Sequence, residues 1–111
     1  MAKKSNDTAF VTGQRDGNRY AIGCTLNNKW VPERQRKELS GTIKDAFYGL
    51  CLDFGVLNLR QKADNFIAYV WLPADLSSQK KMACKRRLGQ ILVDAGIVKR
   101  YLALTDMSKK I

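Results

Sequence analysis

Five basic side chains lie in the segment from Leu76 to Val93, which contains no acidic residue. They are Lys80, Lys81, Lys85, Arg86 and Arg87. Apolar residues recur in this segment with the period of an amphipathic helix. Lys85 and Arg86 are expected to point away from the buried stripe of this helix. Lys80, Lys81 and Arg87 are expected to flank the stripe. Because a helix without acids lacks the i,i+4 ion pairs of an ordinary solvated helix, the pattern predicts contact with phosphates; a solvated helix face is the alternative.

A second candidate lies in the segment from Phe66 to Leu72, where β-branched and aromatic residues predict a central strand. The wholly apolar alternating set is expected to face the helices, and it consists of Phe66, Ala68, Val70 and Leu72. Ile67, Tyr69 and Trp71 then face outward. Arg19, Lys99 and Tyr101 are predicted to lie on that same outward face. Exposed aromatic rings near basic side chains are typical of platforms that stack unpaired bases. Burial of Tyr69 and Trp71 under the N-terminal hairpin or a partner copy is the alternative.

The segment Asn65 to Val70 is similar in part to the third-strand signature of the RNA recognition motif. It supplies the small, aromatic and aliphatic residues of that signature as Ala68-Tyr69-Val70. The basic residue, the glycine and the first aromatic residue of the signature are missing. The matching first-strand position is Ala21 or Gly23, neither of which is aromatic. The sequence is therefore not assigned to that family.

Several kinds of chemistry are disfavoured by composition. Histidine is absent, which excludes an imidazole base, Ser-His and Cys-His nucleophile pairs, and histidine metal ligands. Asp53 and Asp94 lie at the C-terminal ends of the two predicted helices, but nothing in the sequence brings them together, so solvated acids are predicted. The three cysteines are Cys24, Cys51 and Cys84. They are far apart in apolar patterns, which favours buried thiols over a disulfide framework or zinc site. We expect no catalytic site, metal or cofactor.

The charge balance indicates the class of partner. Twenty Lys and Arg residues against ten Asp and Glu residues give a formal net charge of +10 over 111 residues. Such an excess favours polyanions, and nucleic acid first. No apolar run is long enough to cross a bilayer, and no apolar region follows the basic start Met1 to Asp7. We therefore expect no membrane partner and a cytoplasmic location, in a bacterial or phage setting.

The other segments predict an α+β fold. Asp16-Gly17, between the run Phe10-Val11 and the alternating segment Arg19 to Leu26, predicts a hairpin. A helix is expected over Glu33 to Asp53, followed by a short strand over Val56 to Arg60. The second helix should begin at a cap provided by Ser77 or Ser78 and end before Gly96. A last alternating strand is expected over Ile97 to Leu104.

The chain is also similar to itself at an offset of 41 residues. Trp30-Val31-Pro32 aligns with Trp71-Leu72-Pro73, and residues 50–57 align with 91–98. Two βαβ units, residues 20–60 and 61–101, therefore predict a ferredoxin-like fold. This fold has a four-stranded antiparallel sheet with two helices on one face, here with an additional N-terminal hairpin strand. A single domain is expected over residues 9–105, between a flexible N-terminus, 1–8, and a basic tail, 106–111.

Together these patterns predict a small, non-enzymatic protein that binds single-stranded or structured RNA or DNA. The second hypothesis is a basic regulatory or inhibitor protein that docks on an acidic protein surface, with Tyr69 and Trp71 as interface anchors. The choice between RNA and DNA, and the formation of a homodimer, are left open by the sequence.

Overall fold

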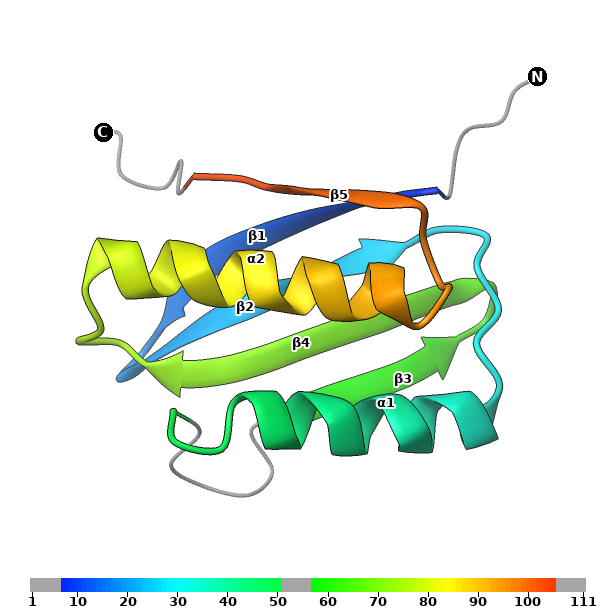
Figure 1. The fold of residues 1–111 in the computed structure, drawn as a ribbon, viewed down its shortest axis with the longest axis horizontal. Coiled ribbons are helices and arrows are strands. Elements are labelled where there is room, and N and C mark those ends of the chain that lie inside the picture. The colour runs from blue at the N-terminus through cyan, green and yellow to red at the C-terminus, as the bar shows by residue number, and fades with distance from the viewer. Residues whose placement is uncertain (1–6, 51–56, 106–111) are drawn as a thin grey trace.

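A computed structural model of the chain describes residues 7–50 and 57–105. The described residues form five strands and two helices in one α+β unit. These elements are β1 (Thr8–Asp16), β2 (Arg19–Leu26), α1 (Glu33–Ala46), β3 (Leu57–Lys62), β4 (Asn65–Pro73), α2 (Ser78–Asp94) and β5 (Arg100–Ala103). The strands form a single sheet in the order β3-β4-β2-β1-β5. Both helices lie on the same face of this sheet, and no helix of the described residues covers the other face (Figure 1).

The sheet is mixed, so the predicted four-stranded antiparallel sheet is wrong. β3, β4, β2 and β1 pair antiparallel, whereas β5 pairs with β1 in parallel. The predicted hairpin explains the difference: Asp16 pairs with Arg19 across a two-residue turn, in which Gly17 has a φ of 63°. This short turn holds β1 against the edge of β2. β5 therefore pairs with the outer edge of β1 instead of with β2.

The core lies between the helices and one face of the sheet. In β4, every residue from Phe66 to Leu72 that was expected to face the helices is buried, and the residues between them are half-buried. β2 contributes Tyr20, Ile22, Cys24 and Leu26 to the same layer. The helices cover it with side chains that include Leu39, Ile43, Leu88 and Leu92. Alternation along β2 and β4 thus separates a packed face from an open one.

The two helices differ from their predicted bounds in different ways. α1 ends at Ala46, well before Asp53, because Phe47 leaves helical geometry with a φ of −107° and Gly49 follows. Residues 51–56, which include the predicted end of this helix, lie outside the described residues. α2 begins after Ser77, whose Oγ accepts a hydrogen bond from Lys80 N at 3.2 Å, as an N-cap should. Neither of the helices described is long and apolar enough to span a membrane.

The landmarks of the internal repeat have different structural settings. Trp30 lies in the loop before α1 and is 69% exposed, whereas Trp71 lies within β4 and is half-buried. Pro32 is the N-cap residue of α1, but Pro73 ends β4, and α2 begins only at Ser78. What the two halves share is connectivity: β2 and β3 run parallel around α1, and β4 and β5 run parallel around α2.

A close approach between β5 and α2 gives the first testable prediction. A Cβ atom at Gly89 would lie 2.5 Å from Tyr101 Cδ1, so Gly89→Ala should destabilise the protein by about 1–3 kcal/mol. Gly41→Ala in α1 is the matched control, because its Cβ would meet no neighbour within 4 Å; alanine's helix preference should raise stability by up to about 1 kcal/mol. Urea unfolding measures both changes. Equal stabilisation of the two variants would contradict the packing of Tyr101 against α2.

Candidate nucleic-acid interface

The centre of the open sheet face carries two aromatic rings. Tyr69 and Trp71 alternate with the buried residues of β4, so both point away from the helices. The register places Gly23 of β2 beside Tyr69 and Ala21 beside Trp71. Two of the smallest side chains therefore stand next to two of the largest. The rings have room to lie over β2 instead of standing upright on the sheet.

The orientation of both rings is fixed by contacts with neighbouring strands. A Cβ atom at Gly23 would lie 2.7 Å from the Tyr69 ring, so this ring occupies the space that a larger residue would fill. Trp71 Nε1 donates a hydrogen bond to Asp16 Oδ2 at 2.8 Å. Since Asp16 belongs to β1 and Trp71 to β4, the indole must extend across β2 to make this bond. The ring centroids are 6.3 Å apart, and the ring planes are inclined by 39°.

The small residues of β2 leave a hollow in the open face, with a volume of about 510 Å³. Ile67, Tyr69 and Trp71 line it on β4, and Ala21 lines it on β2. Its polar margin consists of Thr12, Gln14, Arg15 and Asp16 on β1 and Asn58 on β3. The hollow thus combines aromatic faces with hydrogen-bonding groups at the edges, as sites for flat heterocyclic ligands do.

Cationic side chains surround this hollow on several strands. Arg60 pairs with Ile67, and Lys62 pairs with Asn65, so both exposed cations share the open face. Arg19 is exposed at the opposite end of the face, on the same side of β2 as Ala21. Sequence reasoning named Arg19 but missed Arg60 and Lys62. The signal was available: antiparallel pairing across the turn at Ala63-Asp64 puts Arg60 beside Ile67.

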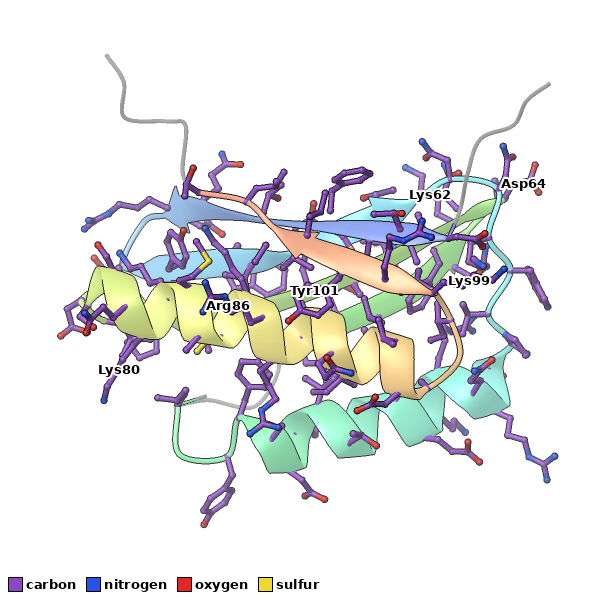
Figure 2. All side chains as sticks on the ribbon, turned by 45° about the horizontal axis from the view of Figure 1, so that its top comes forward. Lys62, Asp64, Lys80, Arg86, Lys99 and Tyr101 are labelled. Carbon is purple, nitrogen blue, oxygen red and sulfur yellow. The ribbon has the colours of Figure 1, made fainter. Side chains whose placement is uncertain are left out.

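Tyr101 does not lie on the open face, so its predicted placement beside Tyr69 and Trp71 is wrong. Its ring packs against Gly89 of α2, on the helical side of the sheet (Figure 2). Lys99 precedes β5 and is exposed, with its Nζ 3.8 Å from Asp7 Oδ2. Figure 2 shows Lys99 at the end of the molecule that also holds Lys62 and Asp64, far from the start of α2.

Lys85 is buried, so the prediction that it points away from the apolar stripe is wrong. Its side chain is only 2% exposed, and its Nζ donates a hydrogen bond to the Leu104 carbonyl at 2.7 Å. The ammonium groups of Lys81 and Lys85 lie 4.4 and 5.8 Å from the centroid of the Tyr20 ring, which supplies cation–π attraction. The absence of a side chain at Gly13 leaves room for this arrangement, because a Cβ there would lie 2.7 Å from Lys85 Cε.

Three of the five predicted basic residues remain exposed on α2: Lys80, Arg86 and Arg87. Lys80 and Arg87 border a hollow of about 280 Å³ between α2 and the residues around the end of α1, where Cys84 lies at the wall. Because α2 covers one face of the sheet (Figure 1), these cations lie on the helical side, whereas Tyr69 and Trp71 face away from the helices. The two candidate surfaces are therefore separated by the sheet and the core.

The remaining candidates are the two aspartates and the three cysteines, of which three residues are described. Asp94 is exposed and accepts a hydrogen bond from Gln90 Nε2 at 2.8 Å, while Asp53 lies outside the described residues. Cys24 and Cys84 are buried, and burial raises the pKa of the Cys24 thiol to about 12. Cys51 lies outside the described residues. Among those described, no three Cys, Asp or Glu side chains gather as metal ligands would.

Comparison of the chain with protein-family models, with curated proteins and with solved structures gives no match.

The burial of Lys85 gives a second prediction, in which its exposed neighbour Arg86 is the control. Lys85→Ala should lower the free energy of unfolding by about 2–3 kcal/mol, because it removes a packed stem and leaves the Leu104 carbonyl without this donor. Arg86→Ala should change it by less than about 0.5 kcal/mol. Denaturant unfolding compares the two variants. Equal midpoints would show that Lys85 does not tie the residue after β5 to α2.

Proposed function

We propose that this protein binds single-stranded nucleic acid on the open face of its sheet, with unpaired bases stacked on Tyr69 and Trp71. The main support is that both rings are held over the small residues of β2, within a hollow that is large enough for a base. The protein acts in this proposal as a binding module without catalytic activity.

Fixed, partly exposed rings suit base stacking for two physical reasons. A ring already held by Gly23 or Asp16 loses little conformational freedom when a ligand covers it. Stacking also removes from water the apolar area that Ile67, Tyr69 and Trp71 leave uncovered in the hollow. Every base offers a flat π-face for this purpose, and each stacked base contributes about 1–3 kcal/mol.

Single strands fit the open face better than a duplex does. In a duplex the bases stack on one another and expose only their edges in the grooves. The rings of Tyr69 and Trp71 would therefore have no base face on which to stack. An extended strand on this face would have cations near its phosphates at both ends. Arg19 lies at one end, and Arg60 and Lys62 lie toward the other. Between Asn65 and Pro73, β4 spans about 27 Å at ~3.4 Å per residue, which is long enough for several nucleotides.

The basic surface of α2 is a second, separate contact surface in this proposal. A strand on the open face meets Lys80, Arg86 and Arg87 only by passing around an end of the molecule. The hairpin end offers such a passage, because Ala74 N donates to Asn18 O at 3.3 Å and α2 begins close by, at Ser78. Bases on the sheet are therefore the primary contact, and α2 is a second phosphate surface for longer strands.

Base stacking gives the third prediction. Trp71→Ala should weaken binding of an eight-nucleotide single strand by about 1–3 kcal/mol, because one stacking face is lost. Trp30→Ala, which removes a 69% exposed indole from the loop before α1, is the control and should bind as the wild type does. Fluorescence anisotropy of a labelled oligonucleotide measures both affinities. In Trp30→Ala, Trp71 is also the only tryptophan left, so its emission should be quenched when the oligonucleotide binds.

Two results would reject the stacking site. Unchanged affinity in Trp71→Ala, with the fold retained by circular dichroism, would show that no base lies on this ring. Absence of binding by the wild type at low salt would reject nucleic acid as the partner and leave the acidic protein surface as the hypothesis.

Phosphate contacts give the fourth prediction, which compares the two cationic surfaces. Replacing Arg60 and Lys62 by Gln should reduce the slope of log K against log salt by about 1.4, at ~0.7 for each single-strand phosphate contact. Replacing Arg86 and Arg87 by Gln removes the same charge from α2 and should leave the slope for an eight-nucleotide strand unchanged. The opposite pattern would place the phosphates on α2 and contradict the open-face site.

A further inference from the structure

Asp16 occupies an unusual position among the charged residues of the sheet. It is the only acidic residue in the five strands, which also contain the cations Arg15, Arg19, Arg60, Lys62 and Arg100. It is exposed, and it lies in the margin of the hollow that holds Tyr69 and Trp71. A carboxylate at this place repels a polyanion, so a surface that served only to attract phosphates would gain by losing it.

The contacts of Asp16 leave its carboxylate able to accept further hydrogen bonds. Oδ2 accepts one bond, from Trp71 Nε1, and an ionised carboxylate has about four acceptor positions. The ion pairs between described residues do not include Asp16. Arg15, its neighbour in β1, directs its Nε to the Gly17 carbonyl at 3.1 Å. The carboxylate can therefore accept further hydrogen bonds beside the rings of Tyr69 and Trp71.

Stacking would bring the edge of a base to this carboxylate. Asp16 lies at the Nε1 edge of the indole, so a base that covers the ring and extends beyond that edge presents its own hydrogen-bonding groups there. Because Asp16 accepts but cannot donate when ionised, it selects bases by their N–H groups. Guanine carries two adjacent donors on its Watson–Crick edge, the ring N1–H and the exocyclic amino group, which match the two oxygens of one carboxylate.

We propose that Asp16 makes the hollow selective for guanine, an inference that rests on the single-strand site proposed above. Uracil presents one donor between two carbonyl acceptors, and adenine and cytosine present an amino group beside a ring acceptor. Each of these edges places an acceptor against a carboxylate oxygen, and two acceptors repel. Gln14, which lines the same hollow, supplies an amide that can donate to guanine O6.

The test compares three oligonucleotides of eight nucleotides: all uracil, uracil with one central guanine, and uracil with one central inosine. Inosine keeps the ring N1–H but lacks the exocyclic amino group, so it retains one of the two proposed contacts. The wild type should bind the guanine strand roughly 5- to 150-fold more tightly than the all-uracil strand, as for other bidentate side-chain contacts to a base. The inosine strand should fall between the two.

Asp16→Asn is the informative variant, because its amide oxygen can still accept the hydrogen bond from Trp71 Nε1. The variant should lose the preference for guanine, since its NH₂ group opposes the two donors of the base. It should also bind the all-uracil strand more tightly than the wild type does, because a negative charge has been removed from the site. A role in holding Trp71 alone predicts neither of these changes.

The outcomes separate this inference from the function on which it rests. Wild-type binding without a preference among the three strands would overturn the guanine selectivity and leave the stacking site standing. An equal change of affinity for all three strands in Asp16→Asn would also overturn it, because Asp16 would then act only through charge or through Trp71. Failure of the wild type to bind any of the strands would reject the proposed function itself.

Discussion

The pairing of β2 with β4 is the interaction on which the other features of this protein depend. It extends from Arg19–Pro73 to Leu26–Phe66, and it fixes which side chains of both strands share a face. On the helical side it aligns apolar residues into one layer that α1 and α2 cover. On the other side it sets Ala21 and Gly23 beside Trp71 and Tyr69. A shift of one residue would exchange the two faces, burying the large rings under the helices and exposing the core set.

Two basic residues of α2, Lys81 and Lys85, have a structural role that the composition of the helix does not indicate. The ammonium groups of Lys81 and Lys85 lie over the ring of Tyr20, a residue that is 2% exposed. The ammonium of Lys85 also donates a hydrogen bond to the carbonyl of Leu104, just beyond β5. β5 is only four residues long and pairs with β1 alone, so contacts with α2 supply much of what holds it. Tyr101 against Gly89 and Lys85 against Leu104 are two such contacts. Some of the positive charge of α2 therefore stabilises the sheet edge and is not available to a ligand.

Local patterns predicted the hairpin, the alternation of β4 and a serine cap of α2 at Ser77 or Ser78, because each depends on residues that are close in sequence. The position of β1 could not be predicted in this way, since periodicity assigns residues to faces and does not specify which strand edges pair. Lys85 and Tyr101 were misplaced for a related reason: both depend on glycines distant in sequence, Gly13 and Gly89, that permit close approach. Alternation predicted that Tyr69 and Trp71 face away from the helices, but it did not predict the hollow beside them, because the hollow depends on their neighbours in β2.

A net charge of +10 favours polyanions as partners but does not account for the arrangement of the open face. Cations on both sides of the sheet would attract any nucleic acid, with or without exposed bases. In the proposed function, the aromatic rings would restrict this attraction to ligands that can offer a free base, because only such ligands would cover the apolar area in the hollow. In the same proposal, the carboxylate of Asp16 would oppose the general attraction and favour only those bases that donate hydrogen bonds to it. Under these proposals, net charge would select polyanions, stacking would select single strands among them, and Asp16 would select a particular base.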